Sequence, residues 1–266
     1  MSEKIKDAVK KAYTEVVKSG PGCGCGPACG SPTQEIKNES WNLSESYANV
    51  DGYEEEADYA LGCGLPTRDA QIKKGDTVLD LGSGAGNDVF VARNLVGESG
   101  HVIGVDMTEA MVAKANENKE KLGYTNVDFL LGEIEALPLA ENSIDVTVSN
   151  CVMNLVPSKL KAYQETYRVL KPNGHFNMSD IVLKGDLPKG IRDAVEMYAG
   201  CISGAMEKQE YLEVIAEAGF KNITITKERE IDVPDQVFLH YVSPAELAAF
   251  RESEYAIISL GVYAEK

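Results

Sequence analysis

The sequence predicts an α/β protein with a doubly wound parallel sheet that carries helices on both faces. Five apolar runs have the length and composition of buried strands: residues 77–81, 101–105, 127–131, 144–148 and 176–183. Stretches with helical periodicity lie between them, at residues 88–95, 109–121 and 158–170. Because a crossover between parallel strands needs about a dozen residues or more, this alternation favours right-handed βαβ units.

The N-terminal region, residues 1–58, is predicted to hold one amphipathic helix and a cysteine-rich loop. Apolar side chains recur at helical spacing through residues 4–18, and the pattern stops at Ser19-Gly20-Pro21. Residues 19–32 then change to Gly, Pro, Ser and three cysteines, which is the composition of a loop or a flexible linker.

Residues 59–228 are predicted to form the core domain, and residues 229–266 a small α+β extension at the C-terminal end. Helical patterns continue at residues 191–198 and 208–218, and β-branched residues indicate strands at 222–227 and 256–263. The segment 191–206 follows the fifth strand, where a doubly wound sheet can carry a lid over the carboxyl ends of its strands.

The charge balance restricts the classes of partner. The chain has 266 residues, with 42 Asp and Glu against 26 Lys and Arg, and its net charge is −16. Nucleic acid is not expected as a partner, because binding a polyanion requires clustered basic residues. No apolar stretch approaches the roughly 20 residues that cross a bilayer. The N-terminus lacks the apolar core of a secretory signal, so we expect a cytoplasmic protein.

A glycine-rich turn follows the first predicted strand, in Asp80-Leu81-Gly82-Ser83-Gly84-Ala85-Gly86. Glycines there let a ligand approach the backbone closely. Asn87 stands where a dinucleotide fingerprint has glycine, and no Gly-Lys-Ser/Thr follows as in a P-loop. Asp106 ends the second strand, where a carboxylate can accept hydrogen bonds from both hydroxyls of a ribose. The alternative is a tight strand-to-helix turn without a ligand.

Together with the later Gly132-Glu133-Ile134-Glu135-Ala136-Leu137-Pro138, these motifs resemble the class I S-adenosylmethionine-dependent methyltransferases, across residues 59–220. The resemblance implies a Rossmann-like sheet of seven strands whose last strand is antiparallel. It also implies a cofactor site: the methionine portion over the glycine loop, the ribose at Asp106, the adenine near Met107, Glu133 and Ile134, and Asn150 facing the substrate. Asp80, Gly82, Ser83, Gly84 and Gly86 form the loop side of that site.

Three of the six cysteines are isolated in sequence, which is not the paired spacing of a zinc finger. Cys63 precedes the first strand, Cys151 follows the fourth, and Cys201 falls in the predicted lid, so all three map to one end of the sheet. Each taken singly could be a small buried hydrophobe. Their surroundings, Leu61-Gly62-Cys63-Gly64, Ser149-Asn150-Cys151-Val152-Met153-Asn154-Leu155 and Gly200-Cys201-Ile202-Ser203-Gly204, resemble the cysteine motifs of the arsenite methyltransferases.

The resemblance implies that Cys63, Cys151 and Cys201 hold trivalent arsenic as thiolate ligands. Thiolates suit a soft centre, and three of them leave the arsenic lone pair free to attack the methyl group of S-adenosylmethionine. The attacking atom carries no proton, so orientation is the main contribution and no general base is needed. His101, His175 and His240 are accordingly expected to be structural. Longer family members carry a larger C-terminal region, which leaves the range of products open.

Methylation formally oxidises arsenic, and in the family cysteines form a disulfide that a thiol reductant such as thioredoxin or glutathione reduces. The hypothesis here is that Cys23, Cys25 and Cys29 act as resolving thiols on a glycine-rich loop. An additional metalloid-capture site and an adventitious metal tract are the alternatives for these three. Arsenite or arsenic–thiol conjugates and the reductant are thus the expected partners, in arsenic detoxification.

Two rival functions stay open. A carbon methyltransferase of the ubiquinone and menaquinone type would share the cofactor loop and Leu137-Pro138 but has no reason to place cysteines at all three positions. A noncatalytic arsenic-binding or cofactor-sensing protein is the alternative from another class, and methyl transfer above background would exclude it.

Overall fold

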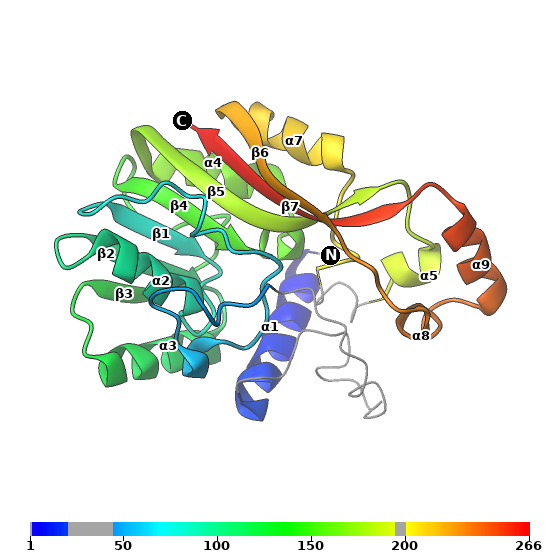
Figure 1. Ribbon diagram of the computed structural model, residues 1–266, viewed down its shortest axis with the longest axis horizontal. Helices are drawn as coiled ribbons and strands as arrows, with labels where there is room; N and C mark the ends of the chain where they lie inside the picture. Colours follow the sequence, from blue (N-terminus) through cyan, green and yellow to red (C-terminus); the bar gives the residue numbers. More distant parts are fainter. Residues whose placement is uncertain (1, 21–44, 195–200) are drawn as a thin grey trace.

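The computed structural model describes residues 2–20, 45–194 and 201–266, which contain a seven-stranded sheet (Figure 1). The strands are β1 (Thr77–Leu81), β2 (His101–Asp106), β3 (Val127–Leu131), β4 (Ile144–Asn150), β5 (Leu170–Lys184), β6 (Lys221–Glu230) and β7 (Ala256–Glu265). Their order across the sheet is β3-β2-β1-β4-β5-β7-β6. Neighbours among β1 to β5 are parallel, and β7 is antiparallel to β5 and β6. The predicted doubly wound sheet with an antiparallel last strand is confirmed.

Helices cover both faces of the sheet. Those of the described residues are α1 (Ser2–Ser19), α2 (Asn87–Val96), α3 (Glu109–Leu122), α4 (Lys159–Val169), α5 (Lys189–Arg192), α7 (Lys208–Glu217), α8 (Asp235–Phe238) and α9 (Pro244–Glu252), with 3-10 turns η2 (Glu55–Ala57) and η3 (Met153–Leu155). Helices α2 and α3 lie on one face, and α4 and α7 lie on the other (Figure 1). Among the described helices, none is long and apolar enough to cross a membrane.

Strand β1 shows why both faces need helices. Val78 packs in one core with Phe90 of α2, and its neighbour Leu79 packs in the opposite core with Tyr163 of α4. Successive side chains of a strand point to opposite faces, so an uninterrupted apolar run is stable only between two layers. The sequence pattern at residues 77–81 reflects this double burial.

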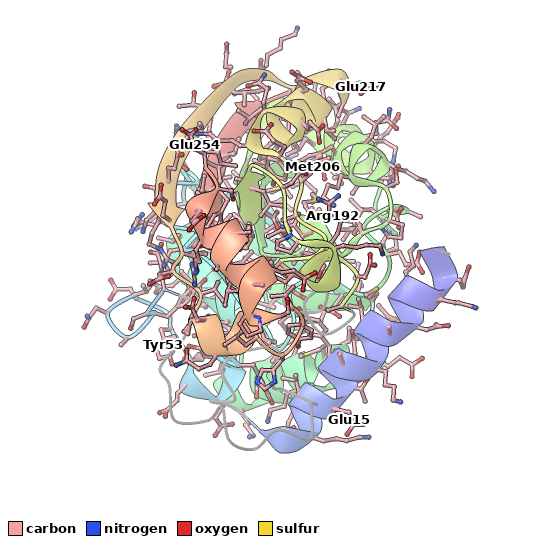
Figure 2. All side chains as sticks on the ribbon, turned by 90° about the vertical axis from the view of Figure 1, so that its right-hand side faces the viewer. Glu15, Tyr53, Arg192, Met206, Glu217 and Glu254 are labelled. Carbon is pink, nitrogen blue, oxygen red and sulfur yellow. The ribbon has the colours of Figure 1, made fainter. Side chains whose placement is uncertain are left out.

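Several elements differ from the predicted boundaries. β5 begins at Leu170 and not at residue 176, because the strand includes an irregular stretch in which Asn173 has a left-handed φ of 66° and the register with β4 shifts. Helix α5 is confined to Lys189–Arg192. Of the predicted helix 191–198, residues 193–194 are not helical, and residues 195–198 lie outside the described part. Helices α8 and α9 were not predicted. They gather with α5 at one end of the molecule (Figure 1), which faces the viewer in Figure 2.

The carboxyl ends of β1, β2 and β4 meet at one edge of the sheet, and α1 lies beside that edge (Figure 1). Lys6 of α1 makes ion pairs of 2.7 Å with the carboxylates of Glu133 and Glu135, which follow β3. Val9 and Tyr13 of the same helix line the cavity at this edge. The N-terminal helix thus forms one wall of the cavity into which the strands point.

Candidate active site

The glycine loop after β1 has a backbone that other residues would strain. Gly82, Gly84 and Gly86 have φ angles of 67°, 53° and 102°. A Cβ atom at Gly82 would lie 2.5 Å from Val152, and one at Gly86 would lie 2.8 Å from Phe129. The left-handed region and this close packing both favour glycine. The loop therefore brings bare backbone to the end of the strand, as the sequence predicts.

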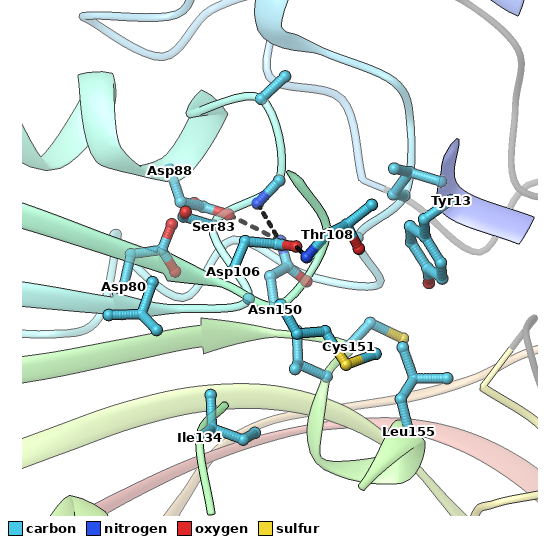
Figure 3. Close-up of a pocket in the computed structure, with 18 of the residues that line it drawn as sticks. Tyr13, Asp80, Ser83, Asp88, Asp106, Thr108, Ile134, Asn150, Cys151 and Leu155 are labelled. Carbon is cyan, nitrogen blue, oxygen red and sulfur yellow. Dashed lines mark hydrogen bonds between the residues drawn. The ribbon is translucent and has the colours of Figure 1, made fainter. Parts of the chain in front are cut away.

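Asp106, at the end of β2, is fixed against this loop. Its carboxylate accepts a 3.0 Å hydrogen bond from the Gly84 amide and a 2.8 Å bond from the Thr108 amide (Figure 3). Burial raises the pKa of Asp106, and those two amides oppose the shift. Each carboxylate oxygen has lone pairs beyond the one used, so the group can also accept hydrogen bonds from two neighbouring hydroxyls of a ligand.

A cavity of about 120 Å³ opens between the glycine loop, α1 and the segments after β2, β3 and β4. Its walls include the predicted cofactor residues Asp80, Gly82, Ser83, Gly84, Asp106, Met107, Glu133, Ile134 and Asn150. Ser83 Oγ and Asn87 Oδ1 also face it, and both are buried without a hydrogen-bond partner among the described residues. Buried polar atoms are normally paired, so these two are free to bind a polar ligand.

Buried carboxylates give this cavity a preference for cations. Burial raises the pKa of Asp80 well above its usual value, and the nearby carboxylates of Asp88 and Asp106 add to the effect. Burial likewise raises the pKa of Asp88 to about 6, opposed by hydrogen bonds from Asn150 and Tyr47. A cation between Asp80 and Asp88 would relieve this repulsion. The sulfonium and ammonium groups of S-adenosylmethionine therefore fit the residues present.

Asp88 and Tyr47 are site residues that the sequence analysis missed. Tyr47 Oη lies 2.9 Å from both carboxylate oxygens of Asp88, and both residues line the cavity. Asp88 stands in the first turn of α2, directly after the glycine loop, and this position could have indicated it. Tyr47 comes from a stretch with no motif, so nothing in its sequence surroundings indicated a role.

Asn150 connects the cavity to the loop that carries Cys63. Its Oδ1 accepts hydrogen bonds from the amides of Cys63, at 2.9 Å, and Gly64, at 3.2 Å. Its Nδ2 donates to Tyr47 Oη at 2.7 Å and to the Gly64 carbonyl at 2.9 Å. A Cβ atom at Gly62 would lie 2.4 Å from this amide. The side chain expected to face the substrate thus also fixes the Cys63 loop.

The structure brings Cys63, Cys151 and Cys201 together. All three are buried, at 0%, 2% and 3% exposure, and they belong to one apolar cluster. Cys201 Sγ donates a hydrogen bond to the Cys151 carbonyl at 2.9 Å, which fixes the Cys201 thiol beside the Cys151 backbone. Cys151 lines the cavity wall opposite Asp80 and Asp88 (Figure 3). Thiols from three separate segments therefore meet beside the cavity.

Two of these cysteines have unusual backbone conformations. Cys151 has a φ of 63° and Cys201 a φ of 64°, in the left-handed region that residues with a Cβ seldom adopt. Cys151 is held there by a 2.7 Å hydrogen bond from its amide to the Ser179 carbonyl. Such strain persists only where surrounding contacts fix it, and it is concentrated at functional sites.

Two thiols of the cluster, those of Cys63 and Cys151, have raised pKa values. Hydrogen bonds with Cys201 and Cys63, together with burial, raise the pKa of the Cys151 thiol well above its usual value. Burial also raises the pKa of Cys63. In the part of the chain that is described, no three His, Cys, Asp or Glu side chains are grouped as metal ligands. A ligand shared by all three sulfurs would therefore have to draw Cys63 and Cys201 closer around Cys151.

The remaining candidates fall into two groups. Cys23, Cys25 and Cys29 lie outside the described residues. Two of the histidines make contacts away from the cavity: His101 pairs with Asp128, and His175 Nε2 lies 2.7 Å from the Ala70 carbonyl. These contacts agree with the structural role expected for them.

Comparisons with known proteins agree with this geometry. Residues 72–219 match a family model described as a methyltransferase domain. The arsenite methyltransferase of Halobacterium salinarum is 39% identical over 237 residues, which are 86% of this chain and 60% of that protein. The crystal structure of an arsenic(III) S-adenosylmethionine methyltransferase from Chlamydomonas reinhardtii is similar with a TM-score of 0.65 and 36% identity, over 77% of this chain and 67% of that chain.

A carbon methyltransferase is similar over a shorter region. The ubiquinone/menaquinone biosynthesis C-methyltransferase of Klebsiella pneumoniae is 39% identical over 105 residues, or 39% of this chain and 41% of that protein. The chain spans between about half and three fifths of the length of the curated arsenite methyltransferases that it matches.

Proposed function

Because this chain belongs to the arsenite S-adenosylmethionine methyltransferase family of class I methyltransferases, we propose that it transfers the methyl group of S-adenosylmethionine to trivalent arsenic. The substrate is arsenite or an arsenic–thiol conjugate, and the role is arsenic detoxification. One observation carries the proposal: Cys63 and Cys201 are buried in one cluster with Cys151, which lines the cavity that contains the glycine loop. A methyltransferase for a carbon acceptor has no use for such a cluster.

The cofactor side of the site binds by charge and backbone contact. Asp106 accepts the ribose hydroxyls, and the bare backbone of Gly82 and Gly84 lies under the methionine portion. The carboxylates of Asp80 and Asp88 attract the sulfonium and ammonium groups of the cofactor, in addition to the backbone contacts. When bound, S-adenosylmethionine supplies a methyl group activated by its sulfonium charge. Met107 and Ile134 provide apolar walls for the adenine.

The thiol side holds the acceptor. Three thiols replace the three hydroxyls of arsenous acid, so that three As–S bonds form, three As–O bonds break, and each thiol proton leaves with a hydroxyl as water. This exchange suits thiols with raised pKa values, because no separate base is required. Arsenic keeps its lone pair, which attacks the methyl group in line with the departing sulfur. Fixing both reactants in one cavity supplies the orientation on which the rate depends.

Turnover also requires two electrons. The new As–C bond uses the arsenic lone pair, which raises arsenic formally to the pentavalent state. Two cysteine thiols return it to the trivalent state by forming a disulfide, and an external thiol reductant such as thioredoxin or glutathione then restores them.

Cys23, Cys25 and Cys29 are the proposed resolving thiols. Changing each of them to Ser tests this: an unaltered multiple-turnover rate and reductant dependence would contradict it.

The decisive experiment incubates the full chain with arsenite, S-adenosylmethionine and excess thiol, and follows methylated arsenic by chromatography with mass detection. We expect methylarsenicals, and we expect arsenite to protect Cys63, Cys151 and Cys201 from alkylation. Cofactor binding without methylarsenicals and without this protection would instead favour a carbon acceptor, as in the Klebsiella pneumoniae relative.

A further inference from the structure

Asn154 contacts the cysteine cluster without being a candidate ligand. It lies in η3, three residues after Cys151, and its side chain is completely buried. Its Nδ2 donates to the Ile181 carbonyl of β5 at 2.5 Å and to the Cys201 carbonyl at 3.2 Å. Its Oδ1 has no partner among the described residues. The two donated bonds therefore determine how this amide is oriented.

These bonds connect the two segments that carry strained cysteines. The Asn154 amide, on the segment that follows β4, binds the carbonyl of Cys201. In return, the Cys201 thiol donates to the carbonyl of Cys151 at 2.9 Å. The left-handed conformations of Cys151 and Cys201 need contacts that fix them, and this reciprocal pair of bonds is such a contact.

The backbone on which Asn154 sits is itself anchored. Asp180, on β5, is buried, and the nearby amides of Met153 and Asn154 oppose the rise that burial causes in its pKa. Its Oδ2 accepts a 3.1 Å bond from Tyr211 Oη. The turn thus packs against β5, and the Asn154 side chain forms its hydrogen bond with Cys201 from this position. The contacts with β5 therefore fix the position of the Asn154 amide, which in turn fixes the segment that carries Cys201.

We propose that Asn154 is a positioning residue that holds Cys201 beside Cys151 and thereby makes the third thiol available for a trivalent metalloid. The inference rests on the proposed function, because it assigns a residue that serves the same site. Asn154 itself binds no substrate. Without its two donated bonds, Cys201 loses the contact from the β4 side that keeps its carbonyl in place, and its thiol is free to leave Cys151.

The test uses Asn154→Ala, which removes the donor, and Asn154→Asp, which keeps nearly the same shape but presents oxygen to two carbonyl oxygens. Asn126→Ala is the matched control. Its Nδ2 also donates to two backbone carbonyls, those of Gly97 and Gly100, both at 2.9 Å, but at the far edge of the sheet. Alkylation of each cysteine is timed by peptide mass spectrometry in the full chain, with and without arsenite, and S-adenosylmethionine affinity is measured by calorimetry.

Without arsenite, we expect Cys201 to be alkylated about tenfold faster in both Asn154 variants, with the rate at Cys63 unchanged within about twofold. Arsenite binding should weaken by about tenfold, with cofactor affinity preserved. The control should match the wild-type protein at Cys201. Equal Cys201 rates in variant and wild type, or a parallel rise at all three cysteines with loss of cofactor affinity, would overturn the proposal.

The two proposals fail in different ways. If arsenite protects none of the cysteines in the wild-type protein, the proposed function is wrong. The alkylation rates without arsenite still report whether Asn154 holds Cys201. If arsenite protects all three in the wild type and equally in both Asn154 variants, the proposed function stands and the positioning role does not.

Discussion

The two halves of the cavity are built in different ways. The cofactor half uses a short continuous stretch, from Asp80 to Asp88, with Asp106 from the adjacent strand, and its shape comes from backbone at strand ends. The thiol half collects Cys63, Cys151 and Cys201 from three separate segments, two of them with left-handed backbone. The first half depends on local geometry, and the second depends on long-range contacts such as those of Asn150 and Asn154. Cofactor binding and acceptor binding should therefore be separable by mutation.

The largest separation is expected for Cys151→Ser, because Cys151 is the cysteine of the cluster that lines the cavity. A hydroxyl replaces the central soft ligand, so methyl transfer should fall below detection, with S-adenosylmethionine affinity unchanged within about twofold. Single-turnover assays and calorimetry on the same preparation measure both. A matching loss of cofactor affinity would show that the two halves are not independent.

The converse change is Asp106→Ala, which removes the carboxylate fixed by the Gly84 and Thr108 amides. Cofactor affinity should fall by about 1.5–3 kcal/mol, the usual contribution of hydrogen bonds to a charged group. Protection of Cys151 by arsenite should stay as in the wild type. Unaltered cofactor affinity would place the ribose elsewhere in the cavity.

The pH dependence of cofactor binding tests the charge of the same half. Asp88 has a pKa raised to about 6 by burial, and its charged form attracts the cationic cofactor. Affinity should therefore be full above pH 7 and should decrease by up to about tenfold per unit as pH falls below 6. Titration calorimetry from pH 5 to 8 measures this.

The control for that profile is Asp88→Asn, which should bind more weakly with a flatter dependence. The free energy of unfolding depends on pH in the opposite direction to the cofactor affinity. The folded, ligand-free protein holds the Asp88 proton more tightly than the unfolded chain, with its ordinary pKa of 3.8. The contribution of this group to stability is therefore greatest below pH 4 and is lost as pH rises through 6. A wild-type affinity independent of pH would exclude Asp88 from cofactor binding.

The smallest effect is expected for Lys6→Ala, which removes the two ion pairs between α1 and the segment after β3. Partly exposed ion pairs contribute little, so cofactor dissociation should accelerate by about two- to fivefold. Lys18→Ala is a matched control, because Lys18 pairs only with Glu15 of the same helix among the described residues. Stopped-flow displacement distinguishes them, and equal rates would show that α1 does not restrict cofactor exit.

Sequence patterns predicted the elements whose signals are local. Strands β1 and β3 have the predicted boundaries, because each is a short run of mainly apolar residues. The start of β5 was missed because Pro172 and Gly174 are typical of turns, and the strand is irregular there, with a left-handed Asn173 and a register shift against β4. Helix α9 had a signal that was overlooked: Ser243 and Glu246 form a capping box, with Pro244 at the first turn.

For the site, as for the fold, the sequence predicted the residues with local signals and missed those that depend on distant partners. The predicted cofactor residues come from motifs, and all of them except Gly86 line one cavity. Asp88 could have been inferred from its place in the first turn of α2, but the roles of Tyr47 and Asn154 depend on partners far away in sequence. That Asn150 holds the Cys63 loop also required three-dimensional information, because an amide at a strand end gives no sign of its partners.

The position of β7 has a consequence for biosynthesis. β6 reaches the sheet only through β7, which lies between it and β5 and is made after every other strand of the sheet. Ser259 of β7 also donates a 2.7 Å hydrogen bond to the carbonyl of Cys63. On the ribosome, where N-terminal parts emerge first, the glycine loop can form while the support of Cys63 is still missing. The order of synthesis therefore allows the glycine loop to fold before the contact that supports Cys63 exists.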